Sequence, residues 1–218
     1  MMNKLFLSFI VFLSLFLSSA AQYEFFIMAM QWPPAYCRIK GTICVQKPSR
    51  FSLHGMWPAN KTVEPRRCSN DQVKTKLTKN MISATALAEL PTSWPNLKGD
   101  NFIFWQHEWF QHGTCSYSTF NQTQYFDQAN NIWKGLQLFD ILQKDGLSPN
   151  TIKYQKTEDF KKAIGKHIGI GTNAVIEFHC SPSSSELLEI RICRNHAGND
   201  YTNCTMYGNC GSSFKWKP

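Results

Sequence analysis

Apolar and polar residues alternate with a period of two near both ends of the chain. In segments 174–179 and 188–193, apolar side chains occupy every second position, a pattern typical of strands with one buried face. Residues 24–31 are apolar and end at Trp32-Pro33-Pro34, and residues 50–54 precede a stop at Gly55 and Pro58. We therefore predict strands over 24–31, 50–54, 174–179 and 188–193.

The middle of the chain changes to a helical period. Phe102, Trp105 and Trp109 recur at steps of three or four residues, which predicts a helix over 102–112 that ends at Gly113. Further helical segments are expected over 71–90, where Pro91 would close the segment, over 122–142 and over 158–167. Helices between terminal strands predict an α+β fold, an antiparallel β-sheet with packed helices.

The first 21 residues predict a secretory signal peptide. Lys4 precedes an apolar run from Leu5 to Leu17, and small residues follow over 18–21. The alternative, a membrane anchor, would need a longer run to cross about 30 Å of hydrocarbon as a helix. We expect a secreted, extracellular protein without a membrane span. The remaining residues, 22–218, are expected to form one domain and a monomer.

Eight cysteines follow the apolar leader: Cys37, Cys44, Cys68, Cys115, Cys180, Cys193, Cys204 and Cys210. An even number behind a signal peptide predicts four disulfides, although eight cysteines allow 105 pairings. Zinc binding is the alternative, but no C-x2-C pair and no finger-like Cys/His spacing occurs. We expect no metal and no cofactor.

The chain is basic, with a formal net charge of +8, which becomes +7 when Lys4 leaves with the leader (8 − 1). A basic protein attracts polyanions such as RNA, although many secreted proteins are basic without acting on nucleic acid. Three N-x-[ST] sequons, at Asn60, Asn121 and Asn203, predict surface glycosylation.

Two segments hold half of the six histidines. They are FSLHGMWP over 51–58 and FWQHEWFQHGTC over 104–115. In a helix, His107 lies four positions before Gln111 and Glu108 lies four positions before His112, so these side chains share one face. Titratable groups beside buried aromatic residues predict an acid–base site, whereas the simpler alternative is a solvated polar face.

Two histidines suit the cleavage of RNA without a metal. One removes the proton from the ribose 2′-OH and the other protonates the departing 5′-oxygen. His112 and His54, from different segments, are candidates, and Glu108 could hold His112 in its useful tautomer. The zincin spacing and the G-x-S-x-G elbow are both missing from the sequence.

At these residues the chain resembles the ribonuclease T2 family, whose two active-site segments have the forms F-x-x-H-G-L-W-P and W-x-x-H-E-W-x-K-H-G-T-C. The upstream Gln31-Trp32-Pro33 and the order of the cysteines also fit, so the resemblance covers the mature chain. It implies an endoribonuclease that cleaves single-stranded RNA through a 2′,3′-cyclic phosphate, on an α+β fold.

The resemblance also implies a role for each matching residue. His54 would be the general acid, His112 the general base and Glu108 a support for the phosphate step. The implied phosphate-binding residues are His107 and Gln111, and the implied base-binding residues are Trp57 and Gln31. The implied disulfides of the plant branch are Cys37–Cys44, Cys68–Cys115, Cys180–Cys210 and Cys193–Cys204.

Gln111 departs from the family pattern, which has lysine at this position. Glutamine donates a hydrogen bond but brings no charge, and the loss of one stabilising group can cost on the order of 10²–10³ in rate. A weakly active binding or storage protein on the same scaffold is therefore an alternative to an efficient enzyme.

Within the family, the basic pI of about 9.1 and the sequons resemble the self-incompatibility ribonucleases of the pistil (S-RNases). This implies pollen F-box proteins as partners and an allele-specific surface over 61–90. The alternative is an S-like ribonuclease of defence or phosphate scavenging.

Overall fold

The computed structural model describes residues 23–205 and 208–218. The predicted signal peptide, 1–21, lies outside the described residues. In the described part, no helix is long and apolar enough to cross a membrane.

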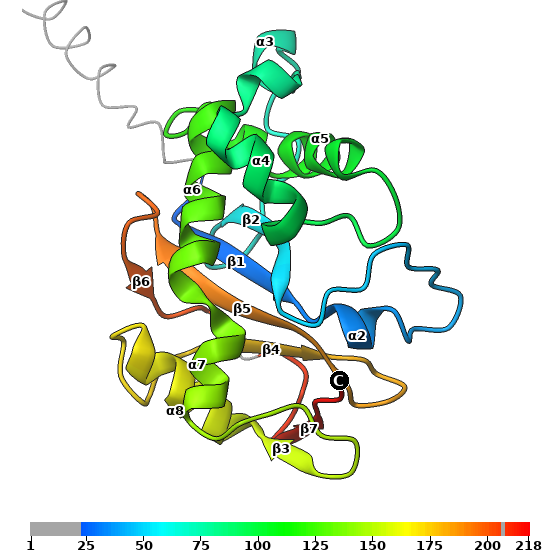
Figure 1. Ribbon diagram of the computed structural model, residues 1–218. Helices are drawn as coiled ribbons and strands as arrows, with labels where there is room; N and C mark the ends of the chain where they lie inside the picture. Colours follow the sequence, from blue (N-terminus) through cyan, green and yellow to red (C-terminus); the bar gives the residue numbers. More distant parts are fainter. Residues whose placement is uncertain (1–22, 206–207) are drawn as a thin grey trace, which may run out of the picture.

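An antiparallel sheet forms the centre of the molecule (Figure 1). Its strands lie in the order β2-β1-β5-β4, and β6 pairs with β5. The bounds are β1 (Phe25–Gln31), β2 (Ser52–Ala59), β4 (Glu177–Cys180), β5 (Leu187–Asn195) and β6 (Tyr201–Thr202). A separate pair joins β3 (Tyr154–Lys156) to β7 (Ser213–Lys215). The predicted α+β class is confirmed.

The helices pack on one face of the sheet, and α6 crosses it in Figure 1. The longer helices are α4 (Ala84–Ser93), α5 (Asn101–Gln111), α6 (Gln122–Leu136), α7 (Leu138–Lys144) and α8 (Thr157–His167). The short ones are α2 (Pro33–Tyr36), α3 (Gln72–Thr75), η1 (Lys79–Met81) and η2 (Gly113–Ser116).

Alternation along the strands assigns the two faces of the sheet. Phe26, Met28 and Met30 of β1 join the main core under the helices, together with Ile190 and Ile192 of β5. The opposite face carries a smaller apolar cluster that includes Ile27, Ala29, Trp57 and Cys193. The period-two pattern therefore predicted correctly which side chains of β5 face the main core.

Two predicted boundaries were wrong. The strand predicted over 50–54 continues to Ala59 through Gly55 and Pro58. Because β2 lies at the edge of the sheet, a proline without an N–H is tolerated there. Pro91 does not close α4 but lies inside its last turns.

The segment predicted as helical over 71–90 is divided among α3, η1 and the start of α4. The helix predicted over 122–142 is broken at Gln137, which has a left-handed φ of 34°. The break separates α6 from α7, and Phe139 of α7 stacks on Trp32 with ring centroids 5.9 Å apart.

The four disulfides are those that the family resemblance implied. They are Cys37–Cys44, Cys68–Cys115, Cys180–Cys210 and Cys193–Cys204. Cys68–Cys115 matters most for the site, because it fastens the loop before α3 to η2, directly after His112.

Candidate active site

His54 is the extra residue of a β-bulge. Along β1, Ala29 pairs with Gly55 and Met30 pairs with Leu53, so His54 has no partner of its own. The bulge turns His54 away from the core, which holds Leu53. The carbonyl of His54 accepts a 2.8 Å hydrogen bond from Trp94 Nε1, so the bulge is anchored to the core beneath it.

Helix α5 supplies the second half of the site. Asp100 caps its N-terminus by accepting a hydrogen bond from the Ile103 N–H at 2.9 Å. Trp105 and Trp109 anchor the helix in the core. Glu108 is only 3% exposed, and His112, at the C-cap, is 5% exposed. The predicted helix therefore places both side chains, although it ends at Gln111.

Trp57 links the two halves. Its indole contacts the rings of His54 and His112, with centroids 5.0 and 5.1 Å away, and donates a 2.9 Å hydrogen bond to Glu108 Oε2. A Cβ atom at Gly55 would lie 1.9 Å from Trp57 Nε1, so only glycine fits there. Glu108 therefore binds Trp57 and not, as the sequence had indicated, the ring of His112.

Trp57, for which the resemblance implied base binding, is buried. The side chain is 4% exposed, and its base-binding role stays a prediction. Phe104 and Tyr36 are the aromatic residues that line the neighbouring cavity. Sequence analysis did not assign a role to Phe104, although it lies within the second histidine segment.

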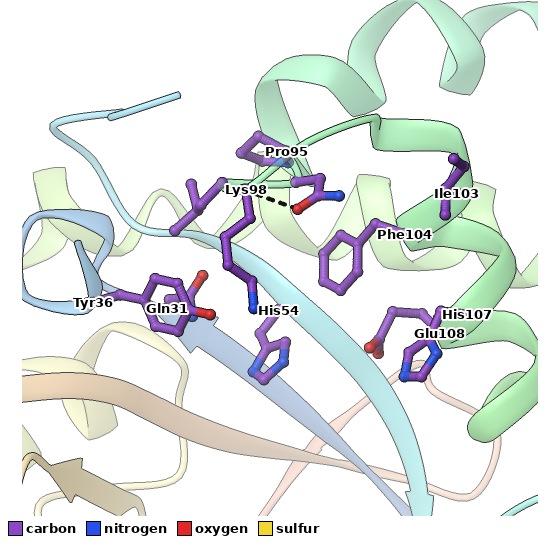
Figure 2. Close-up of a pocket in the computed structure, with 11 residues that line it drawn as sticks. Gln31, Tyr36, His54, Pro95, Lys98, Ile103, Phe104, His107 and Glu108 are labelled. Carbon is purple, nitrogen blue, oxygen red and sulfur yellow. Dashed lines mark hydrogen bonds between the residues drawn. The ribbon is translucent and has the colours of Figure 1, made fainter. Parts of the chain in front are cut away.

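A cavity of about 400 Å³ opens beside His54. In Figure 2, His107 and Glu108 come from α5 on one side, and Gln31 and Tyr36 lie on the other. Lys98, from the loop after α4, also lines the cavity. The structure thus brings Gln31 and His107 to one cavity with His54, whereas His112 lies next to it against Trp57.

Strand β5 adds two charged residues that sequence analysis missed. Glu189 Oε2 lies 2.7 Å from His54 Nδ1, and Arg191 Nε donates to Glu189 Oε1 at 2.7 Å. The guanidinium of Arg191 lies 4.8 Å from the centre of the Trp57 ring. Alternation in 188–193 indicated the polar face of a strand, but no spacing along the chain links that strand to His54.

These charges shift the pKa values of Glu189 and His54 in opposite directions. Burial opposes ionisation of Glu189, but the hydrogen bond and charge of His54, together with Arg191, lower the pKa of Glu189 to about 2. Burial also opposes charge on His54, yet the hydrogen bond to Glu189 and the charges of Glu189 and Glu108 raise the pKa of His54. These shifts favour a protonated His54 beside an ionised Glu189.

Glu108 and His112 show the reverse shifts: the pKa of the carboxyl rises and that of the imidazole falls. Burial raises the pKa of Glu108 to about 7, against the lowering effects of the His54 charge and the Trp57 hydrogen bond. Burial, followed by the positive charges of Arg66 and His54, lowers the pKa of His112 to about 3. His112 Nδ1 is buried and has no hydrogen-bond partner among the described residues. The surroundings thus favour the neutral form of His112 and the charged form of His54.

Gln111 lies at the outer end of this arrangement. Its Oε1 accepts a 3.1 Å hydrogen bond from Arg67 Nε, and its backbone carbonyl accepts one from the Arg67 N–H at 3.0 Å. Arg67 has a left-handed φ of 52°. The position of the family lysine is therefore occupied by a neutral amide that is engaged with an exposed arginine.

Sequence comparison places the chain among plant ribonucleases. The model of the Ribonuclease T2 family matches residues 23–204. Intracellular ribonuclease LX of Solanum lycopersicum is 30% identical over 91% of this chain and 85% of its own length. Ribonuclease MC of Momordica charantia is 33% identical over 88% and 99%. A ribonuclease-like storage protein of Panax ginseng is 31% identical over 82% and 74%.

Structure comparison agrees. Ribonuclease MC1 from the seeds of bitter gourd superimposes with a TM-score of 0.79 at 28% identity, covering 88% of this chain and 100% of that one. Japanese pear S3-RNase superimposes with a TM-score of 0.72 at 25% identity, covering 88% and 96%. The chain therefore belongs to the ribonuclease T2 family and is an endoribonuclease.

Proposed function

We propose that this enzyme cleaves single-stranded RNA by metal-free acid–base transesterification, with His112 as general base and His54 as general acid. The observation that carries the proposal is the opposite environment of the two imidazoles around one indole. His112 is buried beside positive charge, whereas His54 is bound to a carboxylate. A base must be neutral and an acid must be protonated before the reaction.

The reaction balances with these two residues. His112 accepts the proton of the ribose 2′-OH, and the 2′-oxygen forms a bond to phosphorus. The bond from phosphorus to the 5′-oxygen breaks, and His54 gives that oxygen a proton. The product ends are a 2′,3′-cyclic phosphate and a free 5′-OH. His107 and the proton-bearing form of Glu108 would face the phosphate from α5, because both line the cavity.

The cavity offers contacts for a nucleobase of the RNA substrate. Phe104 offers a stacking surface, and Gln31 offers an amide for hydrogen bonding to the base edge. Structures of mutant ribonuclease MC1 have been solved with 5′-UMP and 5′-GMP, which supports nucleotide binding by this kind of scaffold.

The test is cleavage in EDTA. The chain, expressed through a secretory host so that its disulfides form, should cut single-stranded RNA and leave 2′,3′-cyclic phosphate ends. Cleavage that needs added metal, or ends without a cyclic phosphate, would contradict the proposal. No cleavage by a folded protein, beside an active ribonuclease of the same family, would favour the binding or storage alternative, which rests on Gln111 and on the storage relative.

For the biological role we propose a secreted, glycosylated ribonuclease that acts as the pistil determinant of self-incompatibility, with pollen F-box proteins as partners. The net charge of +8 and the three sequons support this role. Asn121 and Asn203 are exposed, and Asn60 is half-buried. The 61–90 segment also exposes Val63 and Val73, at 56% and 69%.

Loss of the gene should abolish rejection of self pollen, and transfer of the gene should confer it. Unchanged pollen rejection would instead favour the S-like role in defence or phosphate scavenging, for which similarity to ribonuclease LX is the supporting observation.

A further inference from the structure

Glu189 of β5 reaches across the sheet to His54, and Arg191 of the same strand contacts Glu189 and Trp57. We propose that Glu189 is a positioning residue that keeps His54 protonated and directs its free Nε2–H to the cavity, and that Arg191 fixes Glu189 in turn. This inference rests on the proposed role of His54 as general acid. It assigns work to a carboxylate and an arginine that lie outside both histidine segments.

Both oxygens of Glu189 are engaged. Oε2 lies 2.7 Å from His54 Nδ1, and Oε1 accepts from Arg191 Nε at 2.7 Å. The residue is 7% exposed, so water does not replace these partners. With Nδ1 bound to the carboxylate, Nε2 is the nitrogen of His54 that remains for substrate. A single tautomer and a single ring orientation result.

The sheet itself lets these long side chains reach β2. Arg191 pairs with Ala29 of β1, and Ala29 pairs with Gly55 of β2. Two small residues in that row leave space above the sheet. Arg191 occupies it, lying over the ring of Trp57, and is held by Glu64 and Glu177 at 3.4 and 3.6 Å. Three carboxylates around one guanidinium fix it in place.

Titratable or charged groups from each neighbouring element surround His54. Glu189 and Arg191 face it from β5, Glu108 and His112 from α5 and its C-cap, and Lys98 lines the same cavity from the loop after α4. The carboxylates favour the imidazolium and the cations oppose it. Glu189 is the only one of these groups within the described residues that forms a hydrogen bond with the ring of His54. The pKa of His54 is raised overall, which agrees with Glu189 having the largest effect among these groups.

The consequence appears in the pH profile. A general acid works while it is protonated, so activity falls as pH rises through the pKa of His54. Removing the charge of Glu189 should lower that pKa and move the alkaline limb of the profile to lower pH. Removing the charge of Arg191, which opposes the imidazolium, should move the same limb to higher pH.

The principal variant is Glu189→Gln, which keeps the size of the side chain and loses its charge. We expect the His54 ring, followed by NMR, to titrate at lower pH than in the wild type, and kcat near neutral pH to fall about tenfold or more. The matched control is Glu186→Gln, another buried carboxylate paired with an arginine, Arg38, but without a histidine contact. It should leave the His54 titration and the pH profile unchanged.

Arg191→Met tests the second residue. Loss of its charge should move the limb to higher pH, but kcat should fall because Glu189 is no longer fixed. An unchanged His54 titration in folded Glu189→Gln would overturn the proposal, and an unchanged kcat in folded Arg191→Met would overturn the role given to Arg191. If Glu189→Gln does not fold, a wild-type His54 that titrates at or below the ordinary histidine range would also overturn it. Wild-type protein that does not cleave RNA in EDTA would refute the proposed mechanism instead, and the NMR titration would still test the pairing.

Discussion

The two histidines of the site both contact Trp57 but have opposite electrostatic surroundings. His54 lies on the bulge of β2 with 35% of its side chain exposed, and its Nδ1 is bound to Glu189. His112 lies at the end of α5 and is 5% exposed, and its Nδ1 has no hydrogen-bond partner within residues 23–205 and 208–218. Both rings contact Trp57. The difference shows how one fold can favour the charged form of an imidazole in one place and the neutral form in another, as the proposed roles of acid and base require.

The carboxylates repeat the contrast. Glu189 is paired with a histidine and an arginine, whereas Glu108 accepts a hydrogen bond from the neutral indole of Trp57. Their pKa values are accordingly driven apart, to about 2 and about 7. A carboxyl that ionises near neutral pH can donate or accept a proton close to the phosphate, and one that ionises near pH 2 acts as a fixed charge.

The largest expected effect breaks the comparison by removing one histidine. His112→Ala removes the neutral imidazole, and cleavage of single-stranded RNA should fall by about 10²–10⁴ while RNA binding persists. Rates and binding are measured on the same preparation. His167→Ala, which removes an exposed histidine of α8, is the control and should retain full activity. Equal rates for wild type and His112→Ala would rule out His112 as the base.

The second effect is on stability and has opposite signs for the two carboxylates. Burial penalises ionised Glu108, a penalty that grows as pH rises from 4.5 to about 7. Glu108→Gln should therefore stabilise the fold above pH 7 by up to about 3 kcal/mol, while activity falls. The ion pairs of Glu189 stabilise the fold above pH 4.5, and this contribution is lost as pH falls towards about 2.

Glu189→Gln should accordingly destabilise the fold at neutral pH by about 3 kcal/mol. Urea unfolding of both variants and the wild type, at pH 7.5 and at pH about 4, measures the two differences. If both substitutions destabilise the fold at neutral pH, the surroundings of Glu108 stabilise its ionised form more than the contacts described above indicate.

The smallest effect sharpens the comparison by adding a charge beside His112. Gln111→Lys restores the residue that the family pattern has, and cleavage should rise about tenfold. Steady-state kinetics should place the gain in kcat. Gln143→Lys, an exposed position on α7, adds the same charge elsewhere and controls for general attraction of RNA. No gain at position 111 would mean that Arg67, which binds Gln111, already compensates.

Local patterns predicted the elements that carry the site. The aromatic spacing of Phe102, Trp105 and Trp109 located α5, and alternation located β5. The predicted end of the second strand was wrong because β2 continues through Gly55 and Pro58. Gly55 is instead required by contact with Trp57, and Pro58 is tolerated at a sheet edge.

The contacts across the sheet could not be predicted from the chain. Glu189 follows His54 by 135 positions, and their contact depends on the strand order β2-β1-β5 and on the bulge. The burial of Trp57 depends on the same stacking of elements. Residue types thus indicated the chemistry, whereas tertiary structure determines which carboxylate serves which histidine.

The anchoring of the bulge has a consequence for thermal inactivation. The carbonyl of His54 is bound by Trp94, whose own carbonyl is bound by Trp105, and both indoles belong to the main core. The active-site backbone is therefore an outer layer of the core and not a detachable loop. Catalysis and near-ultraviolet tryptophan signals should vanish at the same temperature, so enzymatic activity reports on the integrity of the hydrophobic interior.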